Sequence, residues 1–344
     1  MPQVTLEPGG HQFSCDTDET ILSAALRAGF LIPYGCKSGA CGSCKGRILQ
    51  GRVEHGPHQV STLPELERLQ GKCLFCVARP QGDVTVEARD VRKLGDAVIK
   101  ILPCRIEHLE RAADDVTLMR VKLPANAKLH YRAGQSIDFL LKDGKRRSFS
   151  IANAPHEDAY IELHMRHLPG GLFTDRVFGV TEPVLKVRDI LRLEGAHGSF
   201  FLREESQKPI IMVASGTGFA PIKAMIEHMI HSGDKRSVTL YWGGRRPKDL
   251  YLDHLVRAWV EKFPEQFTYV PVVSDALPED NWQGRTGFVH RAVIADFPDL
   301  SGHQVYACGA PIVVDSARAG FTSICGLSDE EFFADSFIVA ATST

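Results

Sequence analysis

The hydrophobic and polar positions divide the chain into three blocks with different periodicities. The first block ends near Val91, where the alternating pattern of residues 83–87 gives way to charged residues. In the second block, short alternating runs such as residues 116–121 are separated by Gly and Pro, which predicts a small antiparallel β-barrel. The third block alternates apolar runs with helical patterns, which predicts an α/β domain with a parallel sheet.

The elements of the third block can be assigned by length and periodicity. Short apolar runs predict buried parallel strands, and apolar residues three and four positions apart predict helices. The predicted strands are residues 210–215, 238–244, 267–273 and 303–309, and the predicted helices are residues 221–230 and 252–263. A further helix is predicted at residues 20–30 of the first block. We therefore expect a multidomain protein with domains at residues 1–93, 97–204 and 205–344.

Composition and charge exclude several classes of protein. The chain has 344 residues, of which 44% are hydrophobic and 24% charged, as in ordinary globular proteins. The formal net charge of −2 and the absence of a polybasic tail argue against a nucleic-acid partner. No apolar run reaches the ~18 residues that a membrane span needs. The polar first ten residues lack a signal-peptide pattern, so we expect a cytoplasmic protein, and we expect it to be monomeric.

The nine cysteines are clustered in a way that indicates metal binding. Cys36, Cys41, Cys44 and Cys76 follow the spacing C-x4-C-x2-C-x31-C, which matches a plant-type [2Fe–2S] cluster. A zinc site is the alternative, because Cys73-x2-Cys76 could pair with Cys41-x2-Cys44. The glycine-rich x4 loop favours the cluster, since glycine lets the backbone wrap closely around it. Cys73 is then a spare, buried thiol.

A second motif lies in the predicted barrel, at residues 146–153. Arg147, Phe149 and Ser150 could hold an anionic aromatic cofactor through a phosphate contact, ring stacking and a hydrogen bond. An ordinary barrel strand is the alternative reading of this segment alone. The segments 163–166 and 170–174 follow, and the second carries a glycine pair through which backbone N–H groups could approach a diphosphate.

A third motif joins a predicted strand to a helix at Gly216-Thr217-Gly218-Phe219-Ala220-Pro221. A glycine turn in this position sets a helix N-terminus against a phosphate, although such turns also occur without a ligand. The strand ending at Cys308 and Gly309 is a further candidate, with a buried structural cysteine as the alternative. Near the end of the chain, Phe337 closes an aromatic segment that could equally be core.

Together these motifs resemble the ferredoxin–NAD(P) reductase superfamily, in three-module order. Residues 1 to 93 resemble a plant-type ferredoxin with a β-grasp fold. The resemblance implies that Ser150, Cys308 and Phe337 lie at the reacting atoms of flavin and nicotinamide. It implies FAD-binding roles for Arg147, Phe149, Ser150, His164, Arg166, Gly170, Gly171, Leu172 and Thr174. It implies nucleotide-binding roles for Gly216, Thr217, Gly218, Pro221, Cys308 and Gly309, and Arg245 and Arg246 follow the strand that ends near the adenosine ribose.

The motif set is most similar to CDP-6-deoxy-3,4-glucoseen reductases and to oxygenase reductase components. It implies transfer of electrons from NADH through FAD and the [2Fe–2S] cluster to a protein acceptor, such as a deoxysugar dehydrase. An oxygenase component is the alternative acceptor, and an iron–sulfur carrier or regulatory protein without reductase activity is the alternative class. NADPH use is possible, because an arginine at position 245 or 246 could accept a 2′-phosphate.

Overall fold

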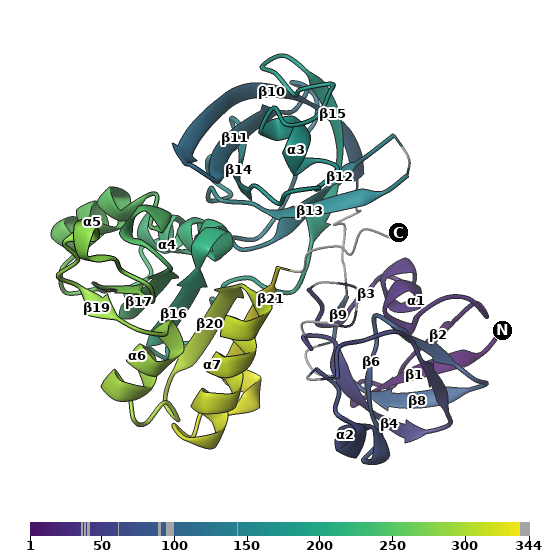
Figure 1. The fold of residues 1–344 in the computed structure, drawn as a ribbon. Coiled ribbons are helices and arrows are strands. Elements are labelled where there is room, and N and C mark those ends of the chain that lie inside the picture. Colours follow the sequence, from purple (N-terminus) through teal and green to yellow (C-terminus); the bar gives the residue numbers. More distant parts are fainter. Residues whose placement is uncertain are drawn as a thin grey trace. The chain divides into compact units, whose positions relative to one another are not determined.

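The computed structural model describes residues 1–35, 37, 39, 42–60, 62–88, 91–93, 100–142 and 144–337. Its contacts divide the chain into two compact units. The first is Met1–Val98 together with the short segments Gly198–Phe200 and Ala334–Ile338. The second contains Ile99–His197 and Phe201–Phe333, which form a barrel and an α/β domain (Figure 1). Each unit is described by itself.

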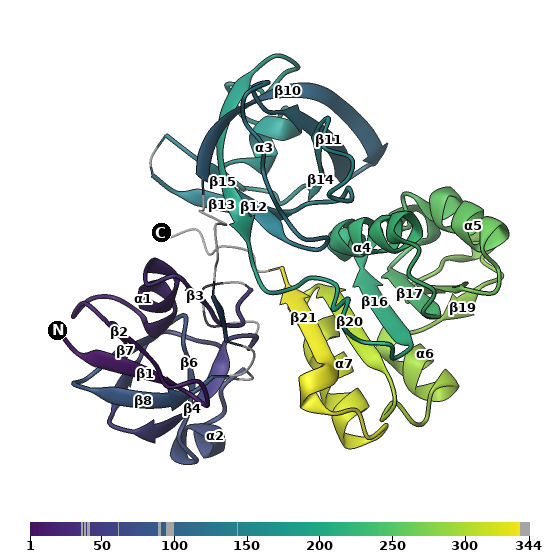
Figure 2. The same cartoon turned by 180° about the vertical axis from the view of Figure 1, so that it is seen from behind.

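The first unit is built on a five-stranded sheet with the strand order β2-β1-β8-β4-β6 (Figure 2). Strand β1 pairs in parallel with β8 and antiparallel with β2. The elements of this unit are β1 (Gln3–Glu7), β2 (His11–Ser14), α1 (Ile21–Arg27), β3 (Phe30–Leu31), β4 (Lys45–Gln50), β5 (Val53–His55), α2 (Glu65–Leu69), β6 (Lys72–Leu74), β7 (Ala78–Pro80), β8 (Val84–Glu87) and β9 (Arg92–Lys93). A mixed sheet covered by one helix is the β-grasp arrangement that the resemblance implies.

Alternation of apolar and polar residues places one face of this sheet in a core. Val4 and Leu6 of β1 are fully buried, and Thr5 between them is partly exposed. Helix α1 contributes Ile21, Leu22 and two alanines to the same core. The helix begins after Thr20, whose side-chain oxygen accepts a hydrogen bond from the N–H of Ser23 at 3.2 Å. This cap satisfies one of the unpaired N–H groups of the first turn.

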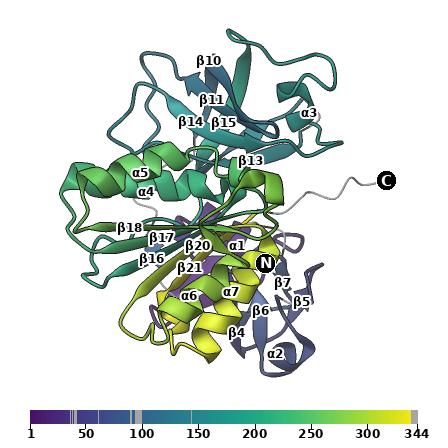
Figure 3. The ribbon, with the colours of Figure 1, turned by 60° about the vertical axis from the view of Figure 1, so that its left-hand side comes forward.

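The second unit begins with a six-stranded antiparallel barrel in the order β13-β12-β15-β10-β11-β14. An isolated bridge between Ile151 and Leu163 links the two ends of this order. The short helix α3 covers one end of the barrel (Figures 1 and 3). The barrel elements are β10 (Lys100–Ala113), β11 (Val116–Lys122), β12 (Ser136–Leu140), β13 (Arg146–Ser150), β14 (Ile161–Arg166), α3 (Thr174–Val177) and β15 (Ile190–His197).

A further sheet has the order β19-β18-β17-β16-β20-β21, with helices on both faces, and all of it except the last three residues of β21 belongs to the second unit. Figure 3 shows α4 and α5 on one face and α6 and α7 on the other. The strands are β16 (Ile210–Ser215), β17 (Val238–Gly244), β18 (Phe267–Val273), β19 (Arg285–Thr286), β20 (Gln304–Gly309) and β21 (Phe332–Ser336). The helices are α4 (Phe219–Ser232), α5 (Asp253–Lys262), α6 (Val289–Asp296) and α7 (Pro311–Ser323), with short 3-10 turns η1 (Gly216–Gly218), η2 (Pro247–Asp249), η3 (Pro278–Asp280) and η4 (Asp329–Glu331).

The predicted fold class is confirmed in each of its three parts. The predicted strand at 210–215 is β16, and the run at 303–309 forms β20 from Gln304. Strand β16 pairs in parallel with both β17 and β20, as buried apolar runs in an α/β domain require. Within the described residues, no helix combines the length and the apolar character needed to cross a membrane.

Candidate functional sites

The two described cysteines of the predicted ligand set are brought together by the pairing of β4 with β6. Lys45 pairs with Leu74, so Cys44, just before β4, lies beside the turn that follows β6. The N–H of Phe75 donates to the carbonyl of Cys44 at 3.1 Å, and Cys76 is the next residue. Both cysteines are buried free thiols in the first unit. This pairing is what a cluster with ligands from a loop and a distant strand end requires.

The loop that carries the other two predicted ligands is described only in part. Cys36 and Cys41 lie outside the described residues. Gly39, between them, has φ +76°, and an added Cβ would lie 2.8 Å from the carbonyl oxygen of Pro57. A side chain at this position is therefore excluded both by the backbone conformation and by the neighbouring segment. The loop needs this glycine to fold closely, as its glycine-rich sequence predicts.

Cys73 lies near these thiols but differs from them in its surroundings. It pairs with Gly46 across the β4–β6 ladder and is fully buried. Burial, with a smaller contribution from Cys44, raises the pKa of the Cys73 thiol to about 12. A thiol held in its protonated form is a poor metal ligand, because the thiolate is the species that binds. These surroundings suit the spare role predicted for Cys73.

Phe149 of the predicted flavin site lies against the segment that carries the glycine pair. Phe149 of β13 is partly buried, and its ring centroid lies 5.5 Å from that of Phe173 in the segment 170–174. Phe139 of β12 packs on both rings, at 5.9 Å from Phe149 and 4.9 Å from Phe173. The structure thus brings together the two motifs that the sequence assigns to one cofactor. Ser150 follows Phe149 and is buried, and the partly exposed Arg147 donates to the carbonyl of Arg146 at 2.8 Å.

The glycine pair is held in place by the residues that follow it. The hydroxyl of Thr174 donates to the carbonyl of Leu168 at 3.1 Å. The carboxylate of Asp175 accepts from the N–H of Gly170 at 3.1 Å and lies 2.9 Å from Nε2 of His167. Asp175 was not identified from the sequence, because an acidic residue in a helix's first turn is common. Gly171 lies inside this ordered loop, and Leu172 is 45% exposed at its surface.

His164 of β14 belongs to a buried polar network. Its Nδ1 lies 2.8 Å from the hydroxyl of Tyr251, and its Nε2 lies 3.3 Å from Glu162. Burial lowers the pKa of His164, although the carboxylate of Glu162 opposes this shift. Burial also acts against ionisation of Glu162, but hydrogen bonding to His164 and the charge of Lys223 hold its pKa well below the usual range. His164 was predicted to bind the cofactor, and this role stays a prediction.

Arg166 links the flavin motif to the nucleotide motif. Its Nε donates to Asp115 at 2.7 Å. An added Cβ on Gly216 would lie only 2.6 Å from a terminal nitrogen of Arg166, so the guanidinium lies against the glycine turn. Both contacts lie inside the second unit. Asp115 could not be identified from the sequence, because no local sequence pattern indicates that its partner lies 51 residues further along the chain, on β14.

The nucleotide motifs lie at the carboxyl edge of the parallel sheet. Strand β16 has β17 on one side and β20 on the other, so the strand order reverses at β16, where α/β sheets bind ligands. Ala214 pairs with Cys308, which sets the turn after β16 beside the turn after β20. An added Cβ on Gly218 would overlap the carbonyl oxygen of Cys308 and lie 2.8 Å from Cα of Gly309. The two predicted nucleotide turns are therefore packed backbone to backbone.

Other predicted nucleotide residues surround this edge. Thr217 is buried in the turn, and Pro221 is buried in the first turn of α4. Trp242 of β17 donates from Nε1 to the carbonyl of Gly216 at 3.0 Å and stacks on Phe219. Phe337 directly follows β21, and its role at the flavin stays a prediction.

The two arginines after β17 differ in their surroundings. Arg246 makes a two-pronged contact with Asp280, with nitrogen–oxygen distances of 2.7 and 2.8 Å. The side chain of Arg245 is 82% exposed and has Asp275 at 3.9 Å. The carboxylate of Asp249 accepts from the backbone N–H groups of both arginines, at 2.8 and 3.0 Å. One arginine is thus already paired with a carboxylate, and the other extends into solvent.

Family models match three successive segments of this chain. A 2Fe-2S iron-sulfur cluster binding domain matches residues 4–81, an oxidoreductase FAD-binding domain matches residues 103–202, and an oxidoreductase NAD-binding domain matches residues 212–319. These matches confirm the predicted order of modules and the predicted cofactors, [2Fe–2S], FAD and NAD. They argue against the alternative of an iron–sulfur carrier without reductase activity. The described residues fit these groups, with two buried thiols on neighbouring segments, a cluster of aromatic rings and two packed glycine turns.

Individual relatives match nearly the whole chain. The CDP-6-deoxy-L-threo-D-glycero-4-hexulose-3-dehydrase reductase of Yersinia pseudotuberculosis is 40% identical over 335 residues, 97% of this chain and 98% of its own. The terephthalate 1,2-dioxygenase reductase component 1 of Comamonas is 35% identical over 344 residues, 99% of this chain and 98% of its own. The crystal structure of the Amycolatopsis cytochrome P450 reductase GcoB is 31% identical, with a TM-score of 0.78 over 99% of this chain and 100% of its own. The chain therefore belongs to the ferredoxin–NAD(P) reductase superfamily, as an NADH-dependent iron–sulfur flavoprotein oxidoreductase.

Proposed function

We propose that this oxidoreductase passes electrons from NADH to a deoxysugar dehydrase. The observation that carries the proposal is its likeness along the whole chain to a reductase named for a CDP-6-deoxyhexulose 3-dehydrase, at 40% identity. The likeness to a terephthalate dioxygenase reductase component is lower, at 35%, but equally complete. An oxygenase component is therefore the second candidate acceptor.

Three separate sets of residues in this chain would bind the three cofactors. Cys44 and Cys76, with Cys36 and Cys41, would hold the cluster. Arg147 would contact the flavin phosphate, Phe149 would pack on the ring system, and Ser150 would donate a hydrogen bond to it.

The third set of residues would bind the nucleotide. Gly216, Thr217 and Gly218 would bind the nucleotide diphosphate at the N-terminus of α4, beside Cys308. When bound, the cofactors supply the hydride and single-electron chemistry, while the protein supplies binding and orientation.

The acceptor is tested by pairing the holoprotein with purified candidates. We expect NADH-driven reduction of a CDP-6-deoxyhexulose 3-dehydrase with kcat/KM at least tenfold above that for a terephthalate dioxygenase oxygenase component. The reverse ratio would assign the chain to oxygenase chemistry. Cytochrome c reduction in the same preparations shows whether each sample is competent in electron transfer, so a failed preparation is recognised.

The arginine geometry supports a preference for NADH over NADPH. Asp280 already accepts two hydrogen bonds from Arg246, and a 2′-phosphate would have to replace that carboxylate. Arg245 is exposed, and an exposed cation gains little from a single phosphate contact in water. The carboxylates of Asp249 and Asp275 add negative charge to the same turn.

Nucleotide preference is measured as kcat/KM for NADH and NADPH. We expect NADH to be favoured in the wild type, and Asp280→Ala to improve NADPH use several-fold by releasing Arg246. Arg245→Ala is the matched control, because it removes a neighbouring charge and leaves the Arg246–Asp280 pair intact. A wild type that prefers NADPH tenfold would overturn the proposed preference.

Compartment and oligomeric state complete the proposal. The seven cysteines in the described part of the chain are free thiols, which suits a reducing compartment such as the cytoplasm. We infer a monomer, and light scattering of the holoprotein at several concentrations tests it. A mass near twice the chain's 38.0 kDa would contradict this inference.

A further inference from the structure

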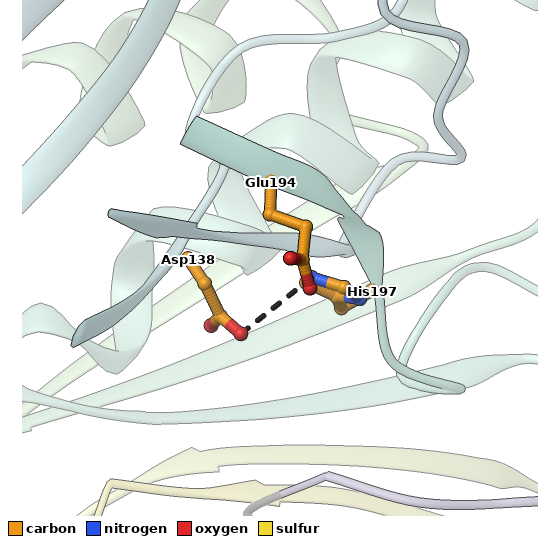
Figure 4. Close-up of side chains that lie close together, drawn as sticks. All are labelled: Asp138, Glu194 and His197. Atoms are coloured by element: carbon orange, nitrogen blue, oxygen red, sulfur yellow. Dashed lines mark ion pairs between the residues drawn. The ribbon is translucent and has the colours of Figure 1, made fainter. Parts of the chain in front are cut away.

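A buried histidine and two carboxylates converge on one side of the barrel, beside strand β13, which carries the predicted flavin residues. They are Asp138 of β12 and Glu194 and His197 of β15, shown in Figure 4. Nε2 of His197 lies 3.5 Å from Oδ2 of Asp138 and 3.5 Å from Oε1 of Glu194. The three atoms all lie within 4.8 Å of one another.

The strand register explains why these residues meet. Asp138 pairs directly with Glu194, and Ser136 pairs with His197, so the three side chains share one face of the β12–β15 ladder. Residues two apart on a strand point to the same side, and directly paired residues lie adjacent. A register irregularity between Ser136 and Ile137 brings His197 toward the two carboxylates.

The oxygen of each carboxylate that does not face His197 is held by a neighbour on β13. The hydroxyl of Ser148 donates to Oδ1 of Asp138, and a terminal nitrogen of Arg146 donates to Oε2 of Glu194 at 2.7 Å. These contacts fix the direction of both carboxylates. The second oxygen of each, Oδ2 and Oε1, is thereby aimed at the imidazole (Figure 4).

The charge balance of this group favours a cation. The side chains of Asp138, Glu194 and His197 are 5%, 14% and 3% exposed. Two carboxylates that are removed from water need compensating positive charge. The half-exposed guanidinium of Arg146 supplies one positive charge. A cation bound between the two carboxylates would add to this compensation.

We propose that Asp138, Glu194 and His197 form a binding site for a divalent transition-metal ion. Zinc bonds to imidazole nitrogen and carboxylate oxygen are about 2.0–2.2 Å long, so a tetrahedral site separates its ligand atoms by about 3.3–3.5 Å. The two separations from Nε2 of His197, both 3.5 Å, match that spacing, and the two carboxylate oxygens lie within 4.8 Å of each other. One imidazole with two carboxylates suits zinc, manganese or iron, whereas magnesium and calcium prefer oxygen ligands alone.

Ser148 and Arg146 would hold the two ligating carboxylates through the oxygens that do not contact the metal. Hydrogen bonds to the non-coordinating oxygens orient ligating carboxylates and tune metal affinity. The ion joins β12 to the last residue of β15, because His197 ends that strand. We assign the ion the role of fixing this corner of the barrel, with the fourth tetrahedral position left to a water molecule.

The test is calorimetric titration of the oxidised holoprotein with zinc chloride. We expect one tight site per chain in the wild type and at least a hundredfold loss of affinity in His197→Ala. Glu194→Gln conserves the side-chain shape, so it tests the site if His197→Ala does not fold, and it should lose affinity tenfold or more. Arg146→Gln should cost about tenfold, as outer partners of metal ligands do.

A surface histidine pair provides the matched control. The rings of His156 and His231 stack with centroids 3.6 Å apart and could bind zinc weakly. His231→Asn should leave the tight site unchanged. Iron and sulfide are measured in every sample, because cysteines released from a damaged cluster would also bind zinc.

Crystals of the holoprotein soaked in zinc give the second readout. An anomalous peak within bonding distance of all three side chains would establish the site. Absence of tight binding by the wild type, equal binding by His197→Ala, or a peak elsewhere would overturn it. The three side chains would then pack together without a metal ion.

Discussion

The cysteine loop and the nucleotide edge of the parallel sheet are assembled in opposite ways. Three of the four predicted cluster ligands lie between residues 36 and 44, so the local chain carries most of that site. The nucleotide edge instead joins the turn at Gly218 to the turn at Gly309, which are distant in sequence and meet through the pairing of β16 with β20. One site depends on covalent ligands, and the other depends on packing.

This difference predicts how each site fails. A thiolate ligand is either present or absent, so losing one should remove the cluster as a whole. A packed backbone junction can shift by fractions of an ångström, so a substitution there should reduce activity in proportion to the displacement. The two sites also belong to different compact units, so damage to one should leave the cofactor of the other in place.

Loss of a cluster ligand should produce the largest effect. We expect Cys76→Ser to lose the iron and the acid-labile sulfide and to reduce NADH-driven cytochrome c reduction by roughly 100-fold or more, because the cluster needs four thiolates. Ferricyanide reduction should continue, since it would need the nucleotide and flavin sites but not the cluster. The same substitution scheme applies to Cys36, Cys41 and Cys44.

Cys73→Ala is the control for Cys76→Ser. Cys73 is fully buried and lies three residues before Cys76, so a general disturbance of this region would affect both variants. We expect Cys73→Ala to keep its iron and its cytochrome c activity. If Cys76→Ser also lost ferricyanide reduction, the expected independence of the two sites would be wrong, because damage to the first unit would have reached the second.

A packing defect at the nucleotide edge should have a smaller, graded effect. Gly218→Ala adds a methyl group where the carbonyl of Cys308 already lies, so the turn must move away from β20. We expect the rate of flavin reduction by NADH to fall roughly 10- to 100-fold, as a displacement of about 1 Å can do. Gly302→Ala is the control, because an added Cβ there meets nothing within 4 Å. Unchanged flavin reduction in Gly218→Ala would show that the contact carries no function.

The comparison also explains which features the sequence could predict. The spacing of the cysteines is a local property, and so are the apolar runs that form β16, β17, β18 and β20. The cluster ligands, the parallel sheet and the glycine turns can therefore be inferred from the order of residues alone. The resemblance to a family supplied the roles that spacing left open.

Partners contributed by distant segments could not be inferred. Tyr251 contacts His164, and Asp115 contacts Arg166, through pairings that no local pattern encodes. The group at Asp138 and His197 arises from strand register and from one irregularity in it, which hydrophobic alternation does not reveal. Buried polar contacts of this kind depend on the tertiary arrangement of side chains, so they appear only in the folded structure.

The buried network at His164 should make the second unit sensitive to mild acid. Burial lowers the pKa of His164, so the folded state holds it neutral while the unfolded chain takes up a proton below about pH 6.5. The free energy of unfolding should therefore fall as the pH falls from 6.5 toward the folded-state pKa, by at most about 1.4 kcal/mol per pH unit. We expect His164→Gln to flatten this dependence.

Urea unfolding followed by tryptophan fluorescence measures the effect, because all three tryptophans, Trp242, Trp259 and Trp282, lie in the second unit. The exposed His108 of β10 provides the control, since His108→Gln removes an imidazole without removing a buried one. Identical pH dependence in His164→Gln and in the wild type would refute the assignment to His164. The cluster should be retained at each pH, because its loss would show that the first unit is also affected.

Removal of the cap of α1 should give the smallest effect and should fall on the first unit alone. Thr20 accepts a hydrogen bond from the N–H of Ser23, and replacing such a cap by alanine typically costs about 1 kcal/mol. Because α1 packs in the same core as Cys44 and Cys76, we expect Thr20→Ala to lower the urea concentration at which the cluster's visible absorbance is lost. Tryptophan fluorescence should report an unchanged midpoint for the second unit. Thr20→Ser keeps the accepting oxygen and should restore the wild-type midpoint, whereas a shift of both midpoints in Thr20→Ala would show that the two units unfold together.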